Sequence, residues 1–484
     1  MLAQHSRFLT QGATEGLMKQ KLTSEQRTLI NRLLDSGDDR NTIARLASVT
    51  PGQVSAIAAH RTMSKYDRPR KPGGAARAAG ATLSESVELM NNSSNHSSSH
   101  SASIPLGTDI DTARPVVWDP YASSNPHVLI LGESGSGKTY TASRLVIELA
   151  HAHLPSIVFD YGQGFSLQHA PEAFRDDVRT IELQLSRDGI GINPLQIFPI
   201  DIHGPATVAQ RVADTFVRVY SRLGVQQHTL LRRAVLELLA EAGISADDRR
   251  TWTKAPPPFR DLEQKLTEYA GSEDATTRRA ASSAGSHVST LFFFNTFRKT
   301  GHALSWSDLL AKRNEVWILQ LGGLEASVER AVTEFLLWSL IRYFEVLGPG
   351  SLRCFVVLDE AHKLAFGSGS PVEKILREGR KFGLGAILAS QQPEDFSPVA
   401  FANTATKIVF QIGDQSGQVS RQLHRKIKNG HSHDYIATAL GTLPRGSAYV
   451  VMANAGCLTR LLSFEDRQRG TNRKVPSTTH KDAK

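Results

Sequence analysis

The sequence predicts an α/β protein built on a mainly parallel sheet, with a helical insertion and a small all-α module at its N-terminal end. Two observations lead to this fold class. Continuous runs of Val, Ile, Leu and Phe recur between residues 106 and 466 with helical patterns between them, and strands buried on both faces of a parallel sheet have this composition. Residues 22–62, by contrast, contain short amphipathic segments with helical spacing.

The N-terminal module, residues 1–65, is predicted to be helix-turn-helix-like. Its first segment, LTSEQRTLINRLLDSG, has a Ser or Thr N-cap, a Glu in the first turn and a glycine stop. Two short helices follow, the second with Thr50 as N-cap and Pro51 at its first position. We expect Ile43, Leu46, Val49, Val54 and Ile57 to share a core. The pattern fits either a DNA-binding or a protein-binding module; the side chains expected on DNA are Gln53, Ser55 and Arg61.

Two segments have the composition of disordered chain. Residues 66–105 include RPRKPGGAARAAG and NNSSNHSSSHSAS, which hold almost no large apolar side chains to offset the entropy of ordering. Residues 467–484 are polar and basic. We therefore expect a flexible linker before the α/β domain and a disordered basic tail after it.

Six apolar runs within residues 106–466 are predicted as strands of one sheet: HVLIL, SIVFD, VWILQL, CFVVLD, AILAS and KIVFQI. From about 203 to 285 the pattern is helical, in segments such as ATVAQRVADTFVRVYSRLG and TLLRRAVLELLAEAG. This stretch is predicted to be a helical insertion in the α/β domain. The three residues Phe292, Phe293 and Phe294 that follow it are expected in the core.

A glycine-rich loop follows the first of these strands and precedes a helix. Its sequence, GESGSGKT, matches the P-loop (Walker A) pattern G-x-x-x-x-G-K-[ST]. Glycines let successive backbone N–H groups turn around a phosphate, and the helix N-terminus adds partial positive charge. The loop therefore predicts binding of ATP and Mg²⁺, with Lys138 reaching the β- and γ-phosphates and the Thr139 hydroxyl binding the metal. The predicted nucleotide-binding residues are Gly132, Glu133, Ser134, Gly135, Ser136, Gly137, Lys138, Thr139 and Tyr140.

Hydrolysis needs a metal ligand and a group that polarises water in addition to the P-loop, and a pair of carboxylates can supply both. In CFVVLDEAHKL, Asp359 and Glu360 come directly after a run that is predicted to be a buried strand. This is a Walker B arrangement, in which Asp359 is expected to hold Mg²⁺, usually through water, and Glu360 to polarise the attacking water. The two motifs together predict an ATPase that converts ATP and water to ADP and phosphate.

Composition narrows the class of protein further. The chain has 484 residues and a formal net charge of +9, which favours a polyanionic partner such as DNA. Its two cysteines argue against a disulfide framework and favour a reducing compartment. No apolar run approaches the roughly 18 residues of a membrane span, and the N-terminus lacks a signal-peptide pattern. We expect a cytoplasmic protein.

The segment VEKILREGRKFGLGAILASQQPEDFS, residues 372–397, resembles a known family. The order DEAH, EGRK-aromatic-G and A-[ST]-Q-R-P-S resembles the HerA–FtsK superfamily of ring-forming, DNA-pumping ATPases, most closely its HerA-like branch. Gln392 stands where that family usually has arginine, and Glu394 where it has serine. VFDYGQGFS, INPL and FANTATKIVFQIGD also resemble family segments. The resemblance spans about 110–465 and implies a RecA-like core that assembles as a homo-hexamer.

Several side-chain roles are implied by the resemblance. Gln391 is expected to sense the γ-phosphate near the attacking water, and Asp160 to join the site from the end of the second strand. An arginine from the neighbouring subunit is expected to complete each site, with Arg380 the first candidate and Arg377 the second. A ring also needs basic loops that follow DNA phosphates. The candidates are Arg298, Lys299, Arg425, Lys426 and Lys428.

Three functions are compatible with these motifs. The first is an ATP-hydrolysing ring motor, a translocase or helicase, that moves along or pumps double-stranded DNA. The second is a conjugative or type IV secretion ATPase acting on protein or relaxase-bound DNA, which INPL favours. The third is a regulator in which ATP switches DNA binding, although Arg380 and Gln391 suit a cycling motor better. No β-barrel is predicted before residue 106, where HerA proteins usually carry one, so a partner such as a nuclease or another mobile-element or defence protein is also expected.

Overall fold

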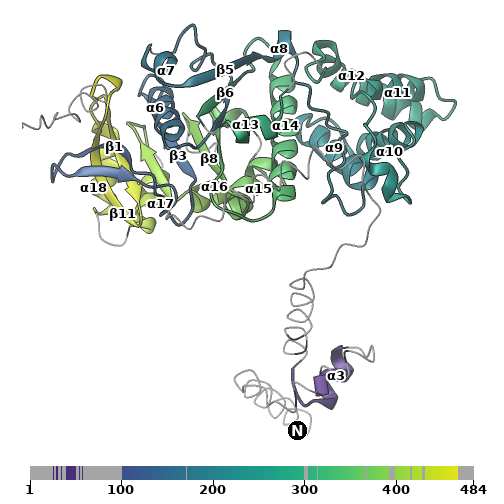
Figure 1. The fold of residues 1–484 in the computed structure, drawn as a ribbon, viewed down its shortest axis with the longest axis horizontal. Coiled ribbons are helices and arrows are strands. Elements are labelled where there is room, and N and C mark those ends of the chain that lie inside the picture. The colour runs from purple at the N-terminus through teal and green to yellow at the C-terminus, as the bar shows by residue number, and fades with distance from the viewer. Residues whose placement is uncertain are drawn as a thin grey trace, which may run out of the picture. The chain divides into compact units, whose positions relative to one another are not determined.

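The computed structural model of the chain divides into two compact units, residues 1–81 and residues 82–484. The residues that the structure describes are 40–50, 101–170, 172–298, 304–312, 314–364, 366–367, 369–391, 398–414, 417–427 and 431–466, with single positions between 26 and 57. Figure 1 shows the secondary structure of both units.

The N-terminal unit has a small core around α3 (Arg40–Leu46). The buried residues of this core are Ile30, Ile43, Ala44, Ala47 and Val54, with Leu34, Val49 and Ile57 packed against them. The expectation for Leu46 was wrong, because its side chain is 60% exposed. A helix turns by about 100° per residue, so Ala47 returns to the face of Ile43 whereas Leu46 points away from it.

One sheet runs through the larger unit. Its parallel strands are β3 (Val128–Leu131), β4 (Ser156–Asp160), β5 (Arg179–Gln184), β6 (Glu315–Gln320), β7 (Cys354–Leu358), β8 (Leu384–Ser390) and β9 (Thr406–Val409). Its antiparallel strands are β1 (Ile104–Asp109), β2 (Pro115–Trp118), β10 (Ser447–Met452) and β11 (Ala455–Leu461). Within the described residues, these strands lie in the order β2-β1-β11-β10-β9-β3-β8-β7-β4-β6-β5. The mainly parallel sheet with flanking helices confirms the predicted fold class, and all six predicted strands are present.

Alternate residues of the central strands face two different layers of helices. Val128 and Ile130 pack in the core that contains α6 (Lys138–His151) and α7 (Glu172–Asp177). Leu129 and Leu131 belong to the core on the other face, with α14 (Ala326–Leu347) and α15 (Pro371–Glu378). Because both faces are covered, the strands are apolar throughout rather than alternating, which is the pattern that made them visible in the sequence.

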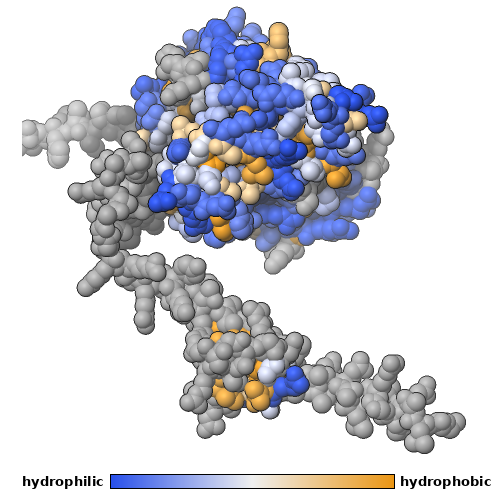
Figure 2. Space-filling model, turned by 90° about the vertical axis from the view of Figure 1, so that its right-hand side faces the viewer, coloured by the Kyte–Doolittle hydropathy of each residue, from blue (hydrophilic) through white to orange (hydrophobic). Residues whose placement is uncertain are grey.

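The predicted helical insertion forms one end of the larger unit, away from β1 and β11 (Figure 1). It consists of α9 (Pro205–Val219), α10 (Val225–Glu241), η1 (Arg249–Thr253), α11 (Asp261–Ala270) and α12 (Ala275–Phe294). Stacked and edge-on contacts among Phe216, Phe259 and Phe335 tie the insertion to α14. Figure 2 looks onto this end, where hydrophilic residues surround a few apolar groups.

The expectation that three consecutive phenylalanines lie in the core was right for one of them. Phe292 is 2% exposed, Phe294 is partly buried, and Phe293 is 82% exposed. All three lie in the last turn of α12, where successive residues point in directions about 100° apart. One helix turn therefore cannot bury all three side chains against the same neighbour.

The remaining elements are short connections around the sheet. They are α8 (Leu185–Asp188), α13 (Trp306–Ala311), η2 (Ala361–Lys363), η3 (Gly379–Phe382), α16 (Pro398–Asn403), α17 (Gln418–Lys426) and α18 (His433–Thr442). Among the helices of the described residues, none combines the length and the apolar character that crossing a bilayer requires. The two cysteines are both free, with Cys354 buried in β7.

Candidate nucleotide site at the carboxyl edge of the sheet

Four neighbouring strands end at the same edge of the sheet and deliver the predicted site residues there. The P-loop follows β3, Gln391 follows β8, Asp359 and Glu360 follow β7, and Asp160 is the last residue of β4. These strands are neighbours in the order β3-β8-β7-β4 and are parallel. Ligands of open α/β sheets bind at such carboxyl edges. The topology thus brings together segments that are more than 200 residues apart in the chain.

The P-loop takes the backbone shape that its glycines permit. Gly135 has φ 74° and Gly137 has φ 110°, and Gly137 is the N-cap of α6. A Cβ atom at Gly132 would lie 2.5 Å from the Ser136 hydroxyl and 2.6 Å from Phe410. Ser136 and Phe410 therefore pack closely against the loop at Gly132. The N–H groups at the N-terminus of α6 are left to bind an anion, as a helix N-terminus does.

Lys138 lies inside the loop rather than on the surface. Its side chain is 6% exposed, and its ammonium group donates a 2.8 Å hydrogen bond to the carbonyl of Glu133. Burial lowers the pKa of Lys138, while the nearby carboxylates of Glu360 and Asp359 oppose that shift. The positive charge is thus held between the loop and the two acidic residues, where the β- and γ-phosphates of a nucleotide are expected.

Thr139 and Asp359 form a direct link between the two motifs. The Thr139 hydroxyl donates a 3.0 Å hydrogen bond to Asp359 Oδ2, while Oδ1 of the same carboxylate is buried without a hydrogen-bond partner among the described residues. Burial raises the pKa of Asp359 to about 6, and the negative charges of Glu360 and Asp160 act in the same direction. A buried carboxylate oxygen without a partner beside a hydroxyl fits a hard divalent cation such as Mg²⁺, which takes one or two protein oxygens and keeps its waters.

Glu360 occupies a strained position beside Gln391. Its backbone is left-handed, at φ 57° and ψ 46°, a conformation that costs free energy in a non-glycine residue and is common at active sites. The amide of Gln391 lies 3.2 Å from both oxygens of the Glu360 carboxylate, and His362 Nδ1 lies 3.1 Å from one of them. Glu360 and Gln391 can therefore act on the same water molecule, the arrangement expected of a general base and a γ-phosphate sensor.

Asp160 supports the site instead of facing it. Its buried carboxylate accepts hydrogen bonds from the N–H groups of Gly162, Gly164 and Phe165 and from the side chain of Gln320. A Cβ atom at Gly164 would lie 2.7 Å from the Thr139 methyl group and 3.7 Å from Asp359 Oδ2. Asp160 thus holds a tight loop against the Thr139–Asp359 pair. We expected it to join the site, and its contacts there position this loop.

The two arginine candidates lie at the other edge of the sheet. Arg377 is in the last turn of α15 and Arg380 is in the 3₁₀ turn η3, which precedes β8. Arg380 donates a hydrogen bond to the carbonyl of Ser124, and Arg377 pairs with Glu373 at 2.8 Å. β8 separates them from Gln391, and its seven residues rise by roughly 20 Å at about 3.3 Å each. Neither arginine reaches the site of its own chain, so a catalytic role for either would have to be in a neighbouring subunit.

The predicted DNA-contacting residues are only partly described. Arg298 donates hydrogen bonds to the carbonyls of Phe294 and Asn295 at the end of α12, and Lys426 donates one of 3.2 Å to the carbonyl of Ala402. Arg425 is exposed on α17. The others, Gln53, Ser55, Arg61, Lys299 and Lys428, lie outside the described residues. Arg298 therefore has a capping role in the fold, and Arg425 is the described candidate that is most available to DNA.

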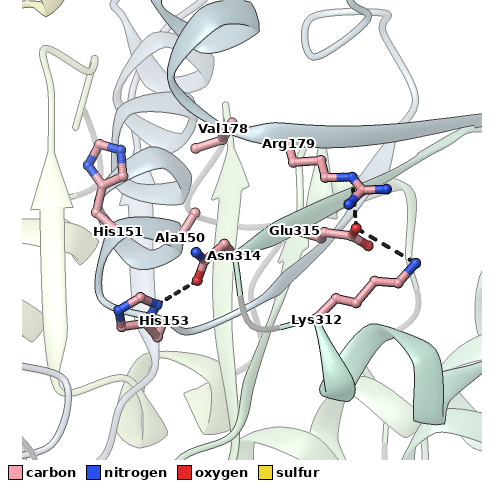
Figure 3. Close-up of a pocket in the computed structure, with 8 residues that line it drawn as sticks. All are labelled: Ala150, His151, His153, Val178, Arg179, Lys312, Asn314 and Glu315. Atoms are coloured by element: carbon pink, nitrogen blue, oxygen red, sulfur yellow. Dashed lines mark hydrogen bonds and ion pairs between the residues drawn. The ribbon is translucent and has the colours of Figure 1, made fainter.

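A cavity of roughly 640 Å³ lies at the amino ends of the strands, opposite the P-loop edge. In Figure 3, Arg179 and Lys312 both reach toward Glu315, at 3.0 and 3.8 Å, and His153 bonds to Asn314. Arg179 and Glu315 are the first residues of β5 and β6. This cavity is separated from the carboxylates and the P-loop by the length of the sheet, and it is not the nucleotide site.

Four residues outside the sequence motifs' predicted site residues support the site. His362 touches Glu360, and Lys363 forms a 3.0 Å ion pair with Glu329 on α14. Gln320 bonds to Asp160. The DEAHKL segment places His362 and Lys363 next to the carboxylate pair, and Gln320 is the last residue of β6, at the same edge. Glu329 carries no local signal, because its partner is 34 residues away in the chain.

Comparisons with known proteins show what the larger unit is similar to. A family model of the central domain of the helicase HerA matches residues 104–340. The DNA double-strand break repair helicase HerA of Saccharolobus solfataricus is 22% identical over 363 residues, 72% of this chain and 66% of that protein. Residues 104–340 are thus similar to the central domain of HerA. The chain spans just under two thirds of the length of that relative.

Solved structures show the same fold. VirB4 of Thermoanaerobacter pseudethanolicus superposes on this chain with a TM-score of 0.60 and 20% identity, covering 76% of this chain and 98% of VirB4. The bacterial conjugative coupling protein TrwB has a TM-score of 0.51 and 15% identity, covering 78% of this chain and 92% of TrwB. Both confirm the predicted P-loop ATPase architecture.

Proposed function

We propose that this chain binds ATP together with Mg²⁺ and hydrolyses it. The observation that carries the proposal is the meeting of Thr139, Asp359 and Glu360 at the carboxyl edge, with Thr139 hydrogen-bonded to Asp359 at 3.0 Å. The backbone of the P-loop and Lys138 would hold the β- and γ-phosphates, and Thr139 and Asp359 would hold the metal. Bound Mg²⁺ would neutralise charge on the phosphates. Glu360 would take a proton from the attacking water, which Gln391 would help to orient.

We further propose that hydrolysis moves a homo-hexameric ring along double-stranded DNA. The support is the match of residues 104–340 to the HerA central domain, the name of a relative, which is a DNA double-strand break repair helicase, and the net charge of +9. An arginine at the far edge of the sheet, Arg380 or Arg377, can complete a site only in trans, and a ring supplies such a neighbour. The alternative, a secretion-type ATPase acting on protein or relaxase-bound DNA, shares the site chemistry and differs in what stimulates it.

The first experiment is steady-state ATP hydrolysis by the full chain, without DNA, with duplex DNA and with single-stranded DNA. We expect Mg²⁺-dependent turnover that duplex DNA stimulates, and a hexamer-sized particle by light scattering. Glu360→Gln is expected to keep ATP binding and to lower kcat by roughly 10²- to 10⁴-fold, because it removes the general base. Lys138→Ala is expected to lose ATP binding, because the phosphates lose their buried cation.

Two results would count against the proposal in different ways. Turnover by Glu360→Gln near the wild-type rate would show that the site assignment is wrong. A monomer whose ATP hydrolysis does not respond to DNA would leave the site assignment intact and would contradict the proposed movement along DNA. In that case the secretion-type function would become the better explanation.

A further inference from the structure

Tyr140 is a large aromatic side chain that is exposed and yet held in place. It lies in the first turn of α6, directly after Thr139, and 40% of its surface is exposed. Its hydroxyl accepts a 2.8 Å hydrogen bond from the N–H group of Phe464. The two rings meet edge to face, with centroids 4.6 Å apart and planes at 68°. Phe464 itself is 6% exposed and belongs to the core on the α6 face of the sheet.

The contact joins the P-loop to a distant part of the chain. Phe464 follows β11, which is three strands away from β3 in the order β11-β10-β9-β3. β11 pairs antiparallel with β10, and β10 pairs antiparallel with β9, so β11 runs in the same direction as β3. Its C-terminal end therefore reaches the carboxyl edge, on the side of the P-loop away from the catalytic carboxylates.

The sheet order fixes the direction in which a bound nucleotide must lie. Asp359, Glu360 and Gln391 follow β7 and β8, on one side of β3. The γ-phosphate has to face them, because Glu360 would act on the water that attacks it. The base is at the other end of the nucleotide, so it has to leave the P-loop toward β9, β10 and β11. Tyr140 and Phe464 lie on that side.

We propose that Tyr140, clamped by Phe464, is the stacking platform for the purine base of the nucleotide. The inference rests on the proposed ATP binding and adds the part of the site that recognises the base. An aromatic ring that is already fixed by a hydrogen bond and an edge contact loses little freedom when a base stacks on its open face. Phe464 acts as a positioning residue, since its backbone and ring set the orientation of Tyr140.

The test compares ligands with and without a base on the full chain in the presence of Mg²⁺. Binding of ATP, ADP and inorganic tripolyphosphate is measured by calorimetry for the wild type and for Tyr140→Ala, Tyr140→Leu and Tyr140→Phe. Tripolyphosphate can use the P-loop but has nothing to stack. Tyr435→Ala is the matched control, because Tyr435 is 37% exposed and lies on α18.

We expect Tyr140→Ala to weaken binding of ATP and ADP by about tenfold or more, which is the usual effect of removing one base–aromatic stack, and to leave tripolyphosphate binding unchanged. Tyr140→Leu should behave in the same way while keeping apolar contact with Phe464, and it decides the matter if the alanine variant does not fold. Tyr140→Phe and Tyr435→Ala should bind all three ligands nearly as the wild type does.

Wild-type affinity for ATP in both Tyr140→Ala and Tyr140→Leu would overturn the inference. So would an equal loss of ATP and tripolyphosphate binding, because it would show that Tyr140 supports the phosphate loop and not the base. If the wild-type chain bound neither ATP nor tripolyphosphate, the proposed function itself would fail, and that result is distinct from the other two.

Discussion

The buried, negatively charged side chain of Asp359 lowers the stability of the folded chain. It is 3% exposed, one oxygen accepts the hydrogen bond from Thr139, and the other lies buried without a hydrogen-bond partner in the described part of the chain. Its pKa is raised from 3.8 to about 6. A buried carboxylate with a strongly shifted pKa is typical of a functional site, where a bound cation can stabilise its charge.

The raised pKa predicts how stability changes with pH in the absence of Mg²⁺. Between about pH 4 and pH 6 the folded chain holds a proton on Asp359 that the unfolded chain has released, so stability falls as the pH rises through this window. Above pH 6 the buried charge lowers the free energy of unfolding by its full amount. That amount is of the order of 3 kcal/mol for a pKa raised from 3.8 to about 6. Asp359→Asn has no charge to bury, so we expect it to melt at a higher temperature than the wild type at pH 7.5.

The measurement is calorimetric melting of both proteins in EDTA at pH 4.5 and pH 7.5. The difference in melting temperature should be large at pH 7.5 and should shrink to about a third of that at pH 4.5, where the folded wild type is protonated and only the unfolded chain has released most of its proton. Addition of Mg²⁺ and ADP should stabilise the wild type and not the variant. Equal melting temperatures at both pH values would show that Asp359 is not held in the environment described.

At the scale of elements, the short turn η2 places Glu360 and is itself tied to α14. Lys363 lies three residues after Glu360 at the end of this turn. It pairs with Glu329 at 3.0 Å and lies over the ring of Tyr161, 5.0 Å from its centre. Tyr161 in turn bonds to Thr333 one helical turn further along α14. The strained backbone of Glu360 is thus followed by a turn that cannot relax without breaking an ion pair, and such restraint is what keeps a strained residue in place.

We therefore expect Lys363→Met to lower kcat by roughly ten- to hundred-fold, since small displacements of a catalytic group have effects of this size, while ATP affinity stays unchanged. Lys363→Arg should restore most of the rate, because it keeps the charge. The matched control is Lys374→Met, which breaks a 2.9 Å ion pair between α15 and Glu345 on the same helix α14. Steady-state kcat and the Kd for ATP are measured for each variant.

An equal loss of kcat in the Lys374→Met control would assign the effect to α14 packing in general and not to the turn. Unchanged kcat in Lys363→Met would show that Glu360 is held without this ion pair.

At the scale of the whole molecule, Arg380 lies too far from the site of its own chain to take part in it. It lies at the amino edge of the sheet, with β8 between it and Gln391. If Arg380 acts on the site of a neighbour, Arg380→Ala should lower kcat by roughly 10³-fold or more and leave ATP binding intact. The Arg380→Ala chain keeps Glu360, and the Glu360→Gln chain, which is also expected to be nearly inactive, keeps Arg380. When the two chains are mixed, some interfaces therefore pair an intact Glu360 with an intact Arg380.

In an equimolar mixed ring, about one quarter of the interfaces are of this kind, so activity should return to about a quarter of the wild-type rate if the sites act independently. The readout is ATP hydrolysis after the two chains have been mixed under conditions of subunit exchange. The same mixture with Arg377→Ala tests the second candidate. No recovery with either arginine, in rings shown to be mixed, would exclude both as trans-acting residues.

Short stretches of sequence predict much of the site, because its chemistry depends on backbone shape and on the spacing of residues. GESGSGKT needs glycines at Gly135 and Gly137, whose backbones have positive φ, and the apolar runs before Gly132 and Asp359 mark buried strands. These local rules predicted six of the seven parallel strands, the P-loop and the carboxylate pair. They could not predict β5, an edge strand that is only partly buried, or the antiparallel strands, whose pairing is decided by distant partners.

Only the tertiary structure decided which side chains meet across the sheet. The strand order placed Gln391 against Glu360, Phe464 against Tyr140 and Glu329 against Lys363. It also separated Arg380 from the site of its own chain and turned Asp160 from a site residue into a support for the loop that covers Thr139. Sequence motifs determine what each segment can bind or catalyse on its own. The crossovers between parallel strands, which no local pattern encodes, determine which of those segments act together.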